Sequence, residues 1–239
     1  MRKRFLAALG AAYIFFWLGG VGAYWFLGEP PAHVAWTAPL FLSLAGVLVL
    51  LTASREDRPR ILACGAVGLL AEIAGVHTGF PFGTYTYTKA LYPHVVGVPL
   101  VMVCAWFILV AYVQEMLREA ALPAWARVGA GAVWLTSIDL VIDPLAAGPL
   151  KYWVWEYPGI YYGIPATNFA GWLLVSLAVC IIAGKTWSPN PHARLIGLSI
   201  VVFFTSIALA KGMLLAAAIG ALLCVLHAIL SRRMPRQHQ

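Results

Sequence analysis

Residues 125–144 read WARVGAGAVWLTSIDLVIDP, an apolar run that holds two carboxylates, Asp139 and Asp143. At about 20 residues, the run has the length that an α-helix needs to cross the hydrocarbon core of a bilayer. The aspartates are four positions apart, so a helix places them on one face, about 6 Å apart along its axis. Because a charge inside a membrane is costly, such a pair indicates a functional site.

Similar apolar runs recur along the whole chain, which is 62% hydrophobic and 10% charged over 239 residues. Its mean hydropathy is +0.84. These values exclude a soluble globular protein and predict an all-α, polytopic transmembrane bundle, one integral membrane domain over residues 1–239. Only Lys211 and Gly212 separate the last two runs, so we expect a tight helical hairpin there, with one kinked helix as the alternative. The expected spans cover approximately residues 5–27, 34–52, 61–79, 95–114, 125–142, 165–183, 193–210 and 212–230.

The placement of basic residues supports this count of eight spans. The chain holds 16 Lys and Arg against 9 Asp and Glu, a formal net charge of +7. Cytoplasmic loops of membrane proteins carry the excess of Lys and Arg. With both termini in the cytoplasm, only Lys89, Lys151 and Lys211 fall in outer segments. The positive charge is therefore a topology signal, and we expect no nucleic-acid partner.

Two intramembrane carboxylates come to the same depth. Glu72 lies 12 residues beyond Arg60, at the inner end of its span, and Asp139 lies 12 residues beyond Arg127. Each is therefore about 18 Å from the inner surface. The common depth predicts that the two side chains meet if their helices are neighbours.

Two further polar residues approach this level from the outer side. Asn168 lies about one turn below Pro165 in the sixth span, and Asp143 directly precedes Pro144, where we expect the fifth helix to end. Burying polar groups in one shared pocket costs less than burying each alone. Apolar surroundings and a second nearby carboxyl both favour the neutral form of a carboxyl. At least one of Glu72, Asp139 and Asp143 is therefore expected to hold a proton near neutral pH.

Two long outer loops carry most of the other unusual residues. They read HTGFPFGTYTYTKALYPH (77–94) and DPLAAGPLKYWVWEYPGIYYGIP (143–165). Both are too rich in aromatic residues for disorder, so we expect them to fold back as a lid on the outer face. Their electron-rich rings suit a cationic intermediate, although an interfacial aromatic belt is the alternative. The candidate substrate-binding residues are Trp153, Trp155, Tyr85, Tyr87, Tyr162 and His77.

Four motifs carry a resemblance to a known family. AEIAGVHTGFPFGTYTY (71–87), GVPL (97–100), SIDLVIDPLA (137–146) and WVWEYPGIYYGIPATNFAGW (153–172) resemble the CruF-type carotenoid 1,2-hydratases, which include the bisanhydrobacterioruberin and γ-carotene hydratases. The resemblance covers about residues 60–185. It implies a bacterial or archaeal membrane enzyme that adds water across the terminal 1,2 double bond of an acyclic carotenoid ψ-end, as in lycopene. It also implies a substrate drawn from the lipid phase and no metal or redox cofactor.

The residues fit this chemistry in their own right. Hydration requires a proton on the less substituted carbon, a short-lived tertiary cation and a water that captures it. We assign the acid to Asp139 and the base that deprotonates the water to Glu72, and the reverse assignment stays open. Each polar side chain has a structural alternative, such as a hydrogen bond between helices. The candidate catalytic residues are Asp139, Glu72, Asp143, Asn168 and Tyr161, the last two as groups that orient the water.

Other classes of membrane protein fit less well. A carotenoid cyclase of the lycopene type would protonate the same end, and a dry pocket would then give a ring. A proton-coupled transporter could use Glu72 and Asp139 as a relay, but no internal repeat is evident. The six histidines lack the paired spacing of di-iron hydroxylases, and the second Asp-rich motif of intramembrane prenyltransferases is missing. The four cysteines lie in separate spans, without metal-ligand spacing.

Overall fold

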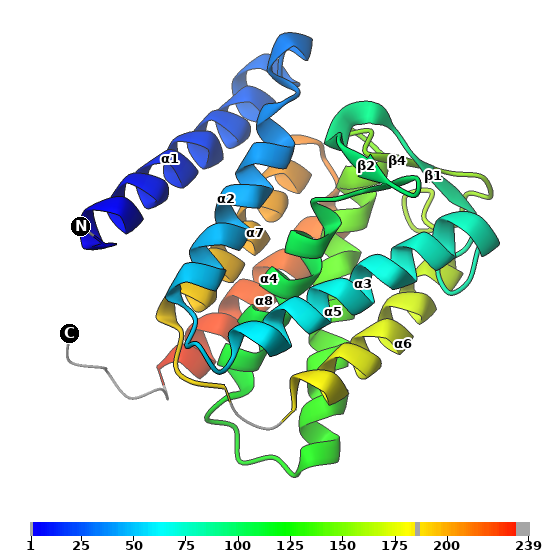
Figure 1. The fold of residues 1–239 in the computed structure, drawn as a ribbon. Helices are drawn as coiled ribbons and strands as arrows, with labels where there is room; N and C mark the ends of the chain where they lie inside the picture. Colours follow the sequence, from blue (N-terminus) through cyan, green and yellow to red (C-terminus); the bar gives the residue numbers. More distant parts are fainter. Residues whose placement is uncertain (1, 185–186, 233–239) are drawn as a thin grey trace.

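The computed structural model describes residues 2–184 and 187–232, which form a bundle of helices with short strands at one end (Figure 1). Lys185, Arg233 and Arg236, three of the basic residues behind the charge asymmetry, lie outside this range. The α-helices are α1 (Arg2–Gly22), α2 (Thr37–Thr52), α3 (Arg58–Thr78), α4 (Met102–Leu117), α5 (Ala124–Ala147), α6 (Ala166–Ala183), α7 (Pro191–Ala210) and α8 (Leu214–Ser231). A π-helical turn, η1 (Ala23–Leu27), extends α1, and 3-10 turns form η2 (Ala32–Val34) and η3 (Lys89–Leu91).

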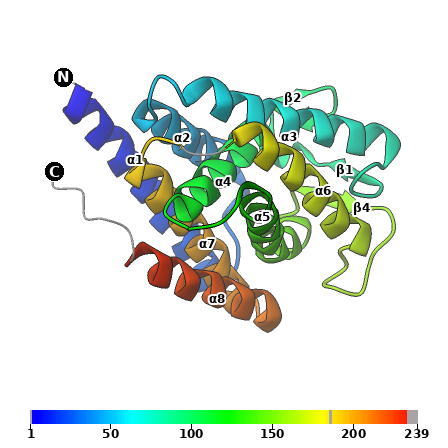
Figure 2. The same cartoon turned by 90° about the horizontal axis from the view of Figure 1, so that it is seen from below.

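The predicted all-α polytopic bundle is confirmed. Within the described residues, seven helices are long and apolar enough to cross a membrane, and α4 is a shorter apolar helix of 16 residues. Seen from below in Figure 2, α4 lies inside the bundle, where it contacts α2, α3, α5, α6, α7 and α8. The expected hairpin is also confirmed, since α7 and α8 are separate helices joined at Gly212, whose φ is +68°.

Hydrogen bonds between the loops that join the helices show which helix ends lie at the same end of the bundle. At one end, the Lys211 ammonium donates to the carbonyl of Gly28 (2.5 Å), and the Thr88 hydroxyl donates to the carbonyl of Lys151 (2.7 Å). At the other end, the backbone N–H of Ser188 donates to the Asp57 carboxylate (2.9 Å). This grouping is the one that eight antiparallel spans require, while the cytoplasmic location of the second end stays a prediction.

α4 begins at Met102, seven residues later than the span expected from residue 95. The intervening residues form an antiparallel hairpin of β2 (His94–Val95) and β3 (Val98–Pro99). Its two turn residues, Val96 and Gly97, have φ values of +50° and +81°. Positive φ at both central positions fits the turn that joins two-residue hairpins. The apolar residues before Met102 therefore belong to the end of the bundle and not to a span.

α5 continues through Pro144 to Ala147, so the expected end at residue 142 is wrong and Asp143 lies inside the helix. A proline in a helix removes one N–H, here the donor for the carbonyl four residues earlier, at Leu140. The Tyr161 hydroxyl donates to that carbonyl instead, at 2.8 Å. The helix passes the proline because the outer loop supplies the missing donor.

Tyr161→Phe is therefore expected to destabilise the protein by about 1–3 kcal/mol, the cost of a partly buried acceptor left without its donor. In a Pro144→Ala background the restored backbone N–H reaches Leu140, and the same change should cost little. Unfolding of the four variants in detergent gives the double-mutant cycle, with an expected coupling of about 1 kcal/mol or more. A cost for Tyr161→Phe that is equal in both backgrounds would contradict this account of the Leu140 carbonyl.

The two outer loops fold back and pair with each other at the end of the bundle that holds the strands. β1 (Tyr85–Tyr87) and β4 (Trp153–Trp155) are antiparallel, with Tyr85 opposite Trp155 and Tyr87 opposite Trp153. The rings of each pair lie 4.9 Å and 5.6 Å apart. We call this two-stranded aromatic segment the lid.

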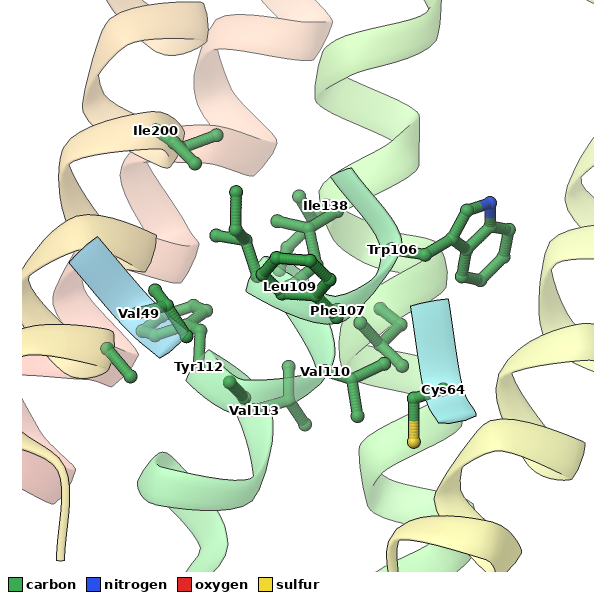
Figure 3. Close-up of a cluster of buried hydrophobic side chains, with 14 of the residues drawn as sticks. Val49, Cys64, Trp106, Phe107, Leu109, Val110, Tyr112, Val113, Ile138 and Ile200 are labelled. Atoms are coloured by element: carbon green, nitrogen blue, oxygen red, sulfur yellow. The ribbon is translucent and has the colours of Figure 1, made fainter. Parts of the chain in front are cut away.

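Close helix contacts at glycines hold the centre of the bundle. On α4, Trp106 extends to one side and Tyr112 to the other (Figure 3). Trp106 stacks on Trp172 of α6, with ring centroids 4.2 Å apart. Its other neighbour is Gly68 of α3, where an added Cβ would lie 2.1 Å from the indole Cγ. Glycine at this position therefore sets where the indole lies.

Gly68→Ala is expected to displace the Trp106 indole and to cost about 1–3 kcal/mol of stability, as overpacked cores do. Gly129→Ala is the matched control, because it is also a helical glycine but has no atom within 4 Å of the added Cβ. The control should gain up to about 1 kcal/mol from helix propensity. Thermal unfolding in detergent measures both changes, and equal melting temperatures would mean that α3 and α4 can move apart freely.

Candidate active site

Glu72 occupies the centre of a set of hydrogen-bond donors beneath the lid. It lies near the end of α3 and is buried. Its Oε2 accepts from the hydroxyls of Tyr85 and Tyr87, the latter at 2.9 Å, and its Oε1 accepts from the indole N–H of Trp106 at 3.1 Å. An indole N–H can only donate. Three donors around one carboxyl match its ionised form, which accepts and does not donate.

The two lid tyrosines are held as proton donors. Burial, and after it the Glu72 carboxyl, raises the pKa of both Tyr85 and Tyr87 above the ordinary value. Both phenols therefore keep their protons at any physiological pH. The lid thus supplies two fixed O–H groups to the carboxylate of α3.

A second buried group joins α5, α6 and the lid. The amide nitrogen of Asn168 donates to Oδ2 of Asp139 at 2.9 Å and to Oδ2 of Asp143 at 2.6 Å. Oδ1 of Asp143 accepts from the indole N–H of Trp153 at 2.7 Å. Two carboxyls that share one amide lie close together. Two like charges in such a position are costly, which is the arrangement in which acidic pairs share protons.

A small cavity of about 20 Å³ connects the two groups. A space of roughly 10–15 Å³ or more, measured in this way, holds one water molecule if polar partners line it. Glu72, Asp143 and Asn168 all line this space. The full lining is Glu72, Phe82, Tyr85, Tyr87, Met102, Asp143, Trp153, Trp155, Asn168 and Trp172. We call this space the carboxyl pocket.

One hydrogen-bond donor of the carboxyl pocket is unused. The indole N–H of Trp155 is buried, and among the described residues it has no hydrogen-bond partner. It lies near the Asp143 carboxyl, which it stabilises without reaching hydrogen-bond geometry. Buried donors are satisfied by protein atoms or by water in nearly all native structures. The orphan N–H therefore indicates a water molecule in the carboxyl pocket.

Most of the residues selected from sequence meet at the carboxyl pocket, but four do not line it. Asp139 accepts a hydrogen bond from Asn168, which lines the pocket, but does not line it itself. Tyr161 is engaged with Leu140, and burial raises the pKa of its phenol to about 12. Tyr162, 38% exposed, accepts the backbone N–H of Leu215 at the start of α8. His77 is exposed, with Nδ1 at 3.0 Å from the carbonyl of Ile73.

The sequence analysis missed three residues that line the carboxyl pocket, Met102, Phe82 and Trp172, and also Trp106, which donates to Glu72 beside it. Trp106 and Met102 belong to an apolar run, where they look like ordinary core residues. A buried indole must find an acceptor, and this need was the one available signal for Trp106. Phe82 and Trp172 carry no such signal. Met102, Phe82 and Trp172 therefore contribute shape to the pocket, and Trp106 contributes a hydrogen bond to Glu72.

Within the described residues, no group of three or more His, Cys, Asp or Glu side chains is placed to hold a metal ion.

Comparisons with known proteins match most of the chain. The family model described as carotenoid biosynthesis protein matches residues 35–230, which extends beyond the core of 60–185 expected from the motifs. Bisanhydrobacterioruberin hydratase of Haloarcula japonica is 37% identical over 126 residues. That match covers 49% of this chain and 42% of the relative, so it spans less than half of the relative's length. No solved structure matches the chain.

Proposed function

Because this integral membrane protein belongs to the carotenoid biosynthesis protein family, we propose that it adds water across the terminal 1,2 double bond of an acyclic carotenoid ψ-end. The product is a tertiary alcohol at C1. The substrate enters from the lipid phase of a bacterial or archaeal cell membrane. The name of the archaeal relative, a hydratase, supports this choice within carotenoid biosynthesis.

The observation that carries the proposal is the carboxyl pocket. It combines room for one water, two carboxyls and the unpartnered N–H of Trp155. A cyclase needs an acid beside a dry cavity, because any water within reach would capture the cation before the ring closes. A polar space of about one water's volume therefore favours an alcohol as the product.

We assign the general acid to Asp143, since it lines the carboxyl pocket and Asp139 does not. Its proton goes to C2 of the alkene, and the electron pair of the double bond forms the new C–H bond. The positive charge is left at tertiary C1. Trp153 holds Asp143 through its N–H and lies beside it, so its ring face is available to the cation.

Glu72 is the general base in this mechanism. The pocket water attacks C1 and forms the C–O bond, and its surplus proton passes to the Glu72 carboxylate. That proton returns to Asp143 across the shared pocket, so that water and alkene are consumed in equal amounts and no other reactant is needed. Asn168 keeps Asp139 and Asp143 together, with Asp139 as the second member of the acidic pair.

Expression in lycopene-producing bacterial cells, followed by mass spectrometry of the pigments, tests the proposal. The expected result is a gain of one water for each modified end. A ring-containing isomer of unchanged mass would show a cyclase. Unaltered pigment, with proton-driven uptake of a solute into vesicles, would show a transporter. Either of these results would overturn the hydratase.

A further inference from the structure

An apolar cavity of about 140 Å³ lies between α1, α2, α4, α5 and α7. None of its lining residues is charged. Aromatic rings form much of its wall, including Phe41 of α2 and Phe203 of α7, which stack with centroids 5.3 Å apart. Aliphatic side chains such as Leu109 and Ile142 complete it. We call this space the apolar cavity.

The apolar cavity adjoins the carboxyl pocket. Met102 and Trp153 line both spaces, so the two adjoin at these side chains. Trp153 is at the same time the residue that donates to Asp143. A molecule in the apolar cavity therefore ends within one side chain of the acid. A void of the size of the apolar cavity weakens the packing of the bundle. The described contacts give no structural reason for such a void at this place.

We propose that the apolar cavity binds the polyene segment directly behind the reacting end of the carotenoid; this inference rests on the proposed function. A cavity of about 150 Å³ accepts a group the size of benzene. This volume corresponds to about one isoprenoid unit of the chain. The aromatic walls suit a flat conjugated segment better than a flexible lipid tail, because flat π-systems stack on ring faces.

The size of the apolar cavity limits how much of the substrate the protein can recognise. One isoprenoid unit is enclosed, so the rest of a carotenoid chain must extend beyond the cavity, into the lipid. α1 is the wall on the lipid side, and its outer residues Phe15 and Leu18 are 71% and 60% exposed. The enzyme therefore recognises one end of its substrate and is indifferent to the far end. A symmetrical substrate is modified one end at a time.

Filling the apolar cavity tests the inference. Ala38→Phe on α2 and Ala105→Phe on α4 each add a benzene ring to its wall. Val47→Phe is the control, on α2 but 42% exposed at the outer surface of the bundle. Variants are compared only if they elute and melt like the unsubstituted protein. The substrates are lycopene and a short acyclic alkene that has the same terminal group but no polyene.

The two filled variants should lose at least about tenfold in kcat/KM for lycopene, since the burial of an isoprenoid unit is lost. The short alkene should react as before, and Val47→Phe should change neither substrate. Equal rates on lycopene in all variants would overturn the inference, and so would an equal loss on both substrates. Hydration by the unsubstituted protein would still stand in both cases.

A binding measurement separates this inference from the proposed reaction. In an Asp143→Asn background, lycopene should co-purify with the protein, and Ala38→Phe should remove most of it. If the unsubstituted protein added no water to lycopene yet this pattern held, the hydratase would be wrong and the polyene site right. Unchanged pigment content in the filled variant would leave a lipid tail as the occupant and overturn the inference.

Discussion

Asp143→Asn is expected to slow hydration by about 10²–10⁴-fold, the range for loss of a general acid or base. Asparagine cannot deliver the proton to C2, but it keeps an oxygen for the N–H of Trp153. Asn168 can turn its amide to accept from the new amide group, and Asp139 in its protonated form can donate to the same oxygen. The variant should therefore fold and still bind carotenoid, which separates the lost step from a lost structure.

Asp139→Asn is the matched control for this prediction. Asp139 shares the helix, the burial and the Asn168 amide with Asp143, but it does not line the carboxyl pocket. We expect it to lower the rate by about tenfold or less, through a weakened acidic pair. Initial rates with lycopene in proteoliposomes measure both variants. If the control lost more activity than Asp143→Asn, the acid would be Asp139, as first assigned from the sequence.

Glu72→Gln is expected to lower the rate by a similar factor, about 10²–10⁴, because an amide cannot accept the proton of the attacking water. The structure tolerates this amide. Its oxygen can accept from Trp106, and its nitrogen can donate to the hydroxyl oxygens of Tyr85 and Tyr87, whose own protons then turn to the water of the carboxyl pocket that both residues line. The stability of the protein should therefore change little.

Glu72→Leu is the comparison variant in which the protein is expected to lose stability. Leucine leaves three buried donors without an acceptor, at about 1–3 kcal/mol for each. We expect this variant to unfold at a clearly lower temperature than Glu72→Gln. Normal hydration by Glu72→Gln would rule out Glu72 as the base and leave it as an anchor for the lid.

The carboxyl pocket was partly predictable, because the depth of a residue in the membrane follows from its number of positions from the end of its helix. Glu72 and Asp139 lie at equal distances from basic span ends, and Asn168 lies between their two groups: it donates to Asp139 and lines the carboxyl pocket together with Glu72. Helix neighbours do not follow from counting. The pairing of α3 with α4 depends on Gly68 and Trp106, two residues in runs without any polar pattern.

The position of Asp143 was not predictable, for a local reason. Proline normally ends a helix, and the sequence gives no sign that Tyr161, 17 positions later, donates to the carbonyl that Pro144 leaves free. The helix therefore continues, and Asp143 faces inward within it. The late start of α4 has a similar cause, since the Val96-Gly97 turn diverts an apolar stretch into a hairpin.

Isotope labelling of the product tests the central claim most directly. The purified protein is incubated with lycopene in water enriched in ¹⁸O, and separately in D₂O. The account predicts heavy oxygen in the new hydroxyl and one deuterium on the adjacent carbon, with neither label in Asp143→Asn. Oxygen that came from O₂ instead, or a ring-containing product without added oxygen, would contradict it.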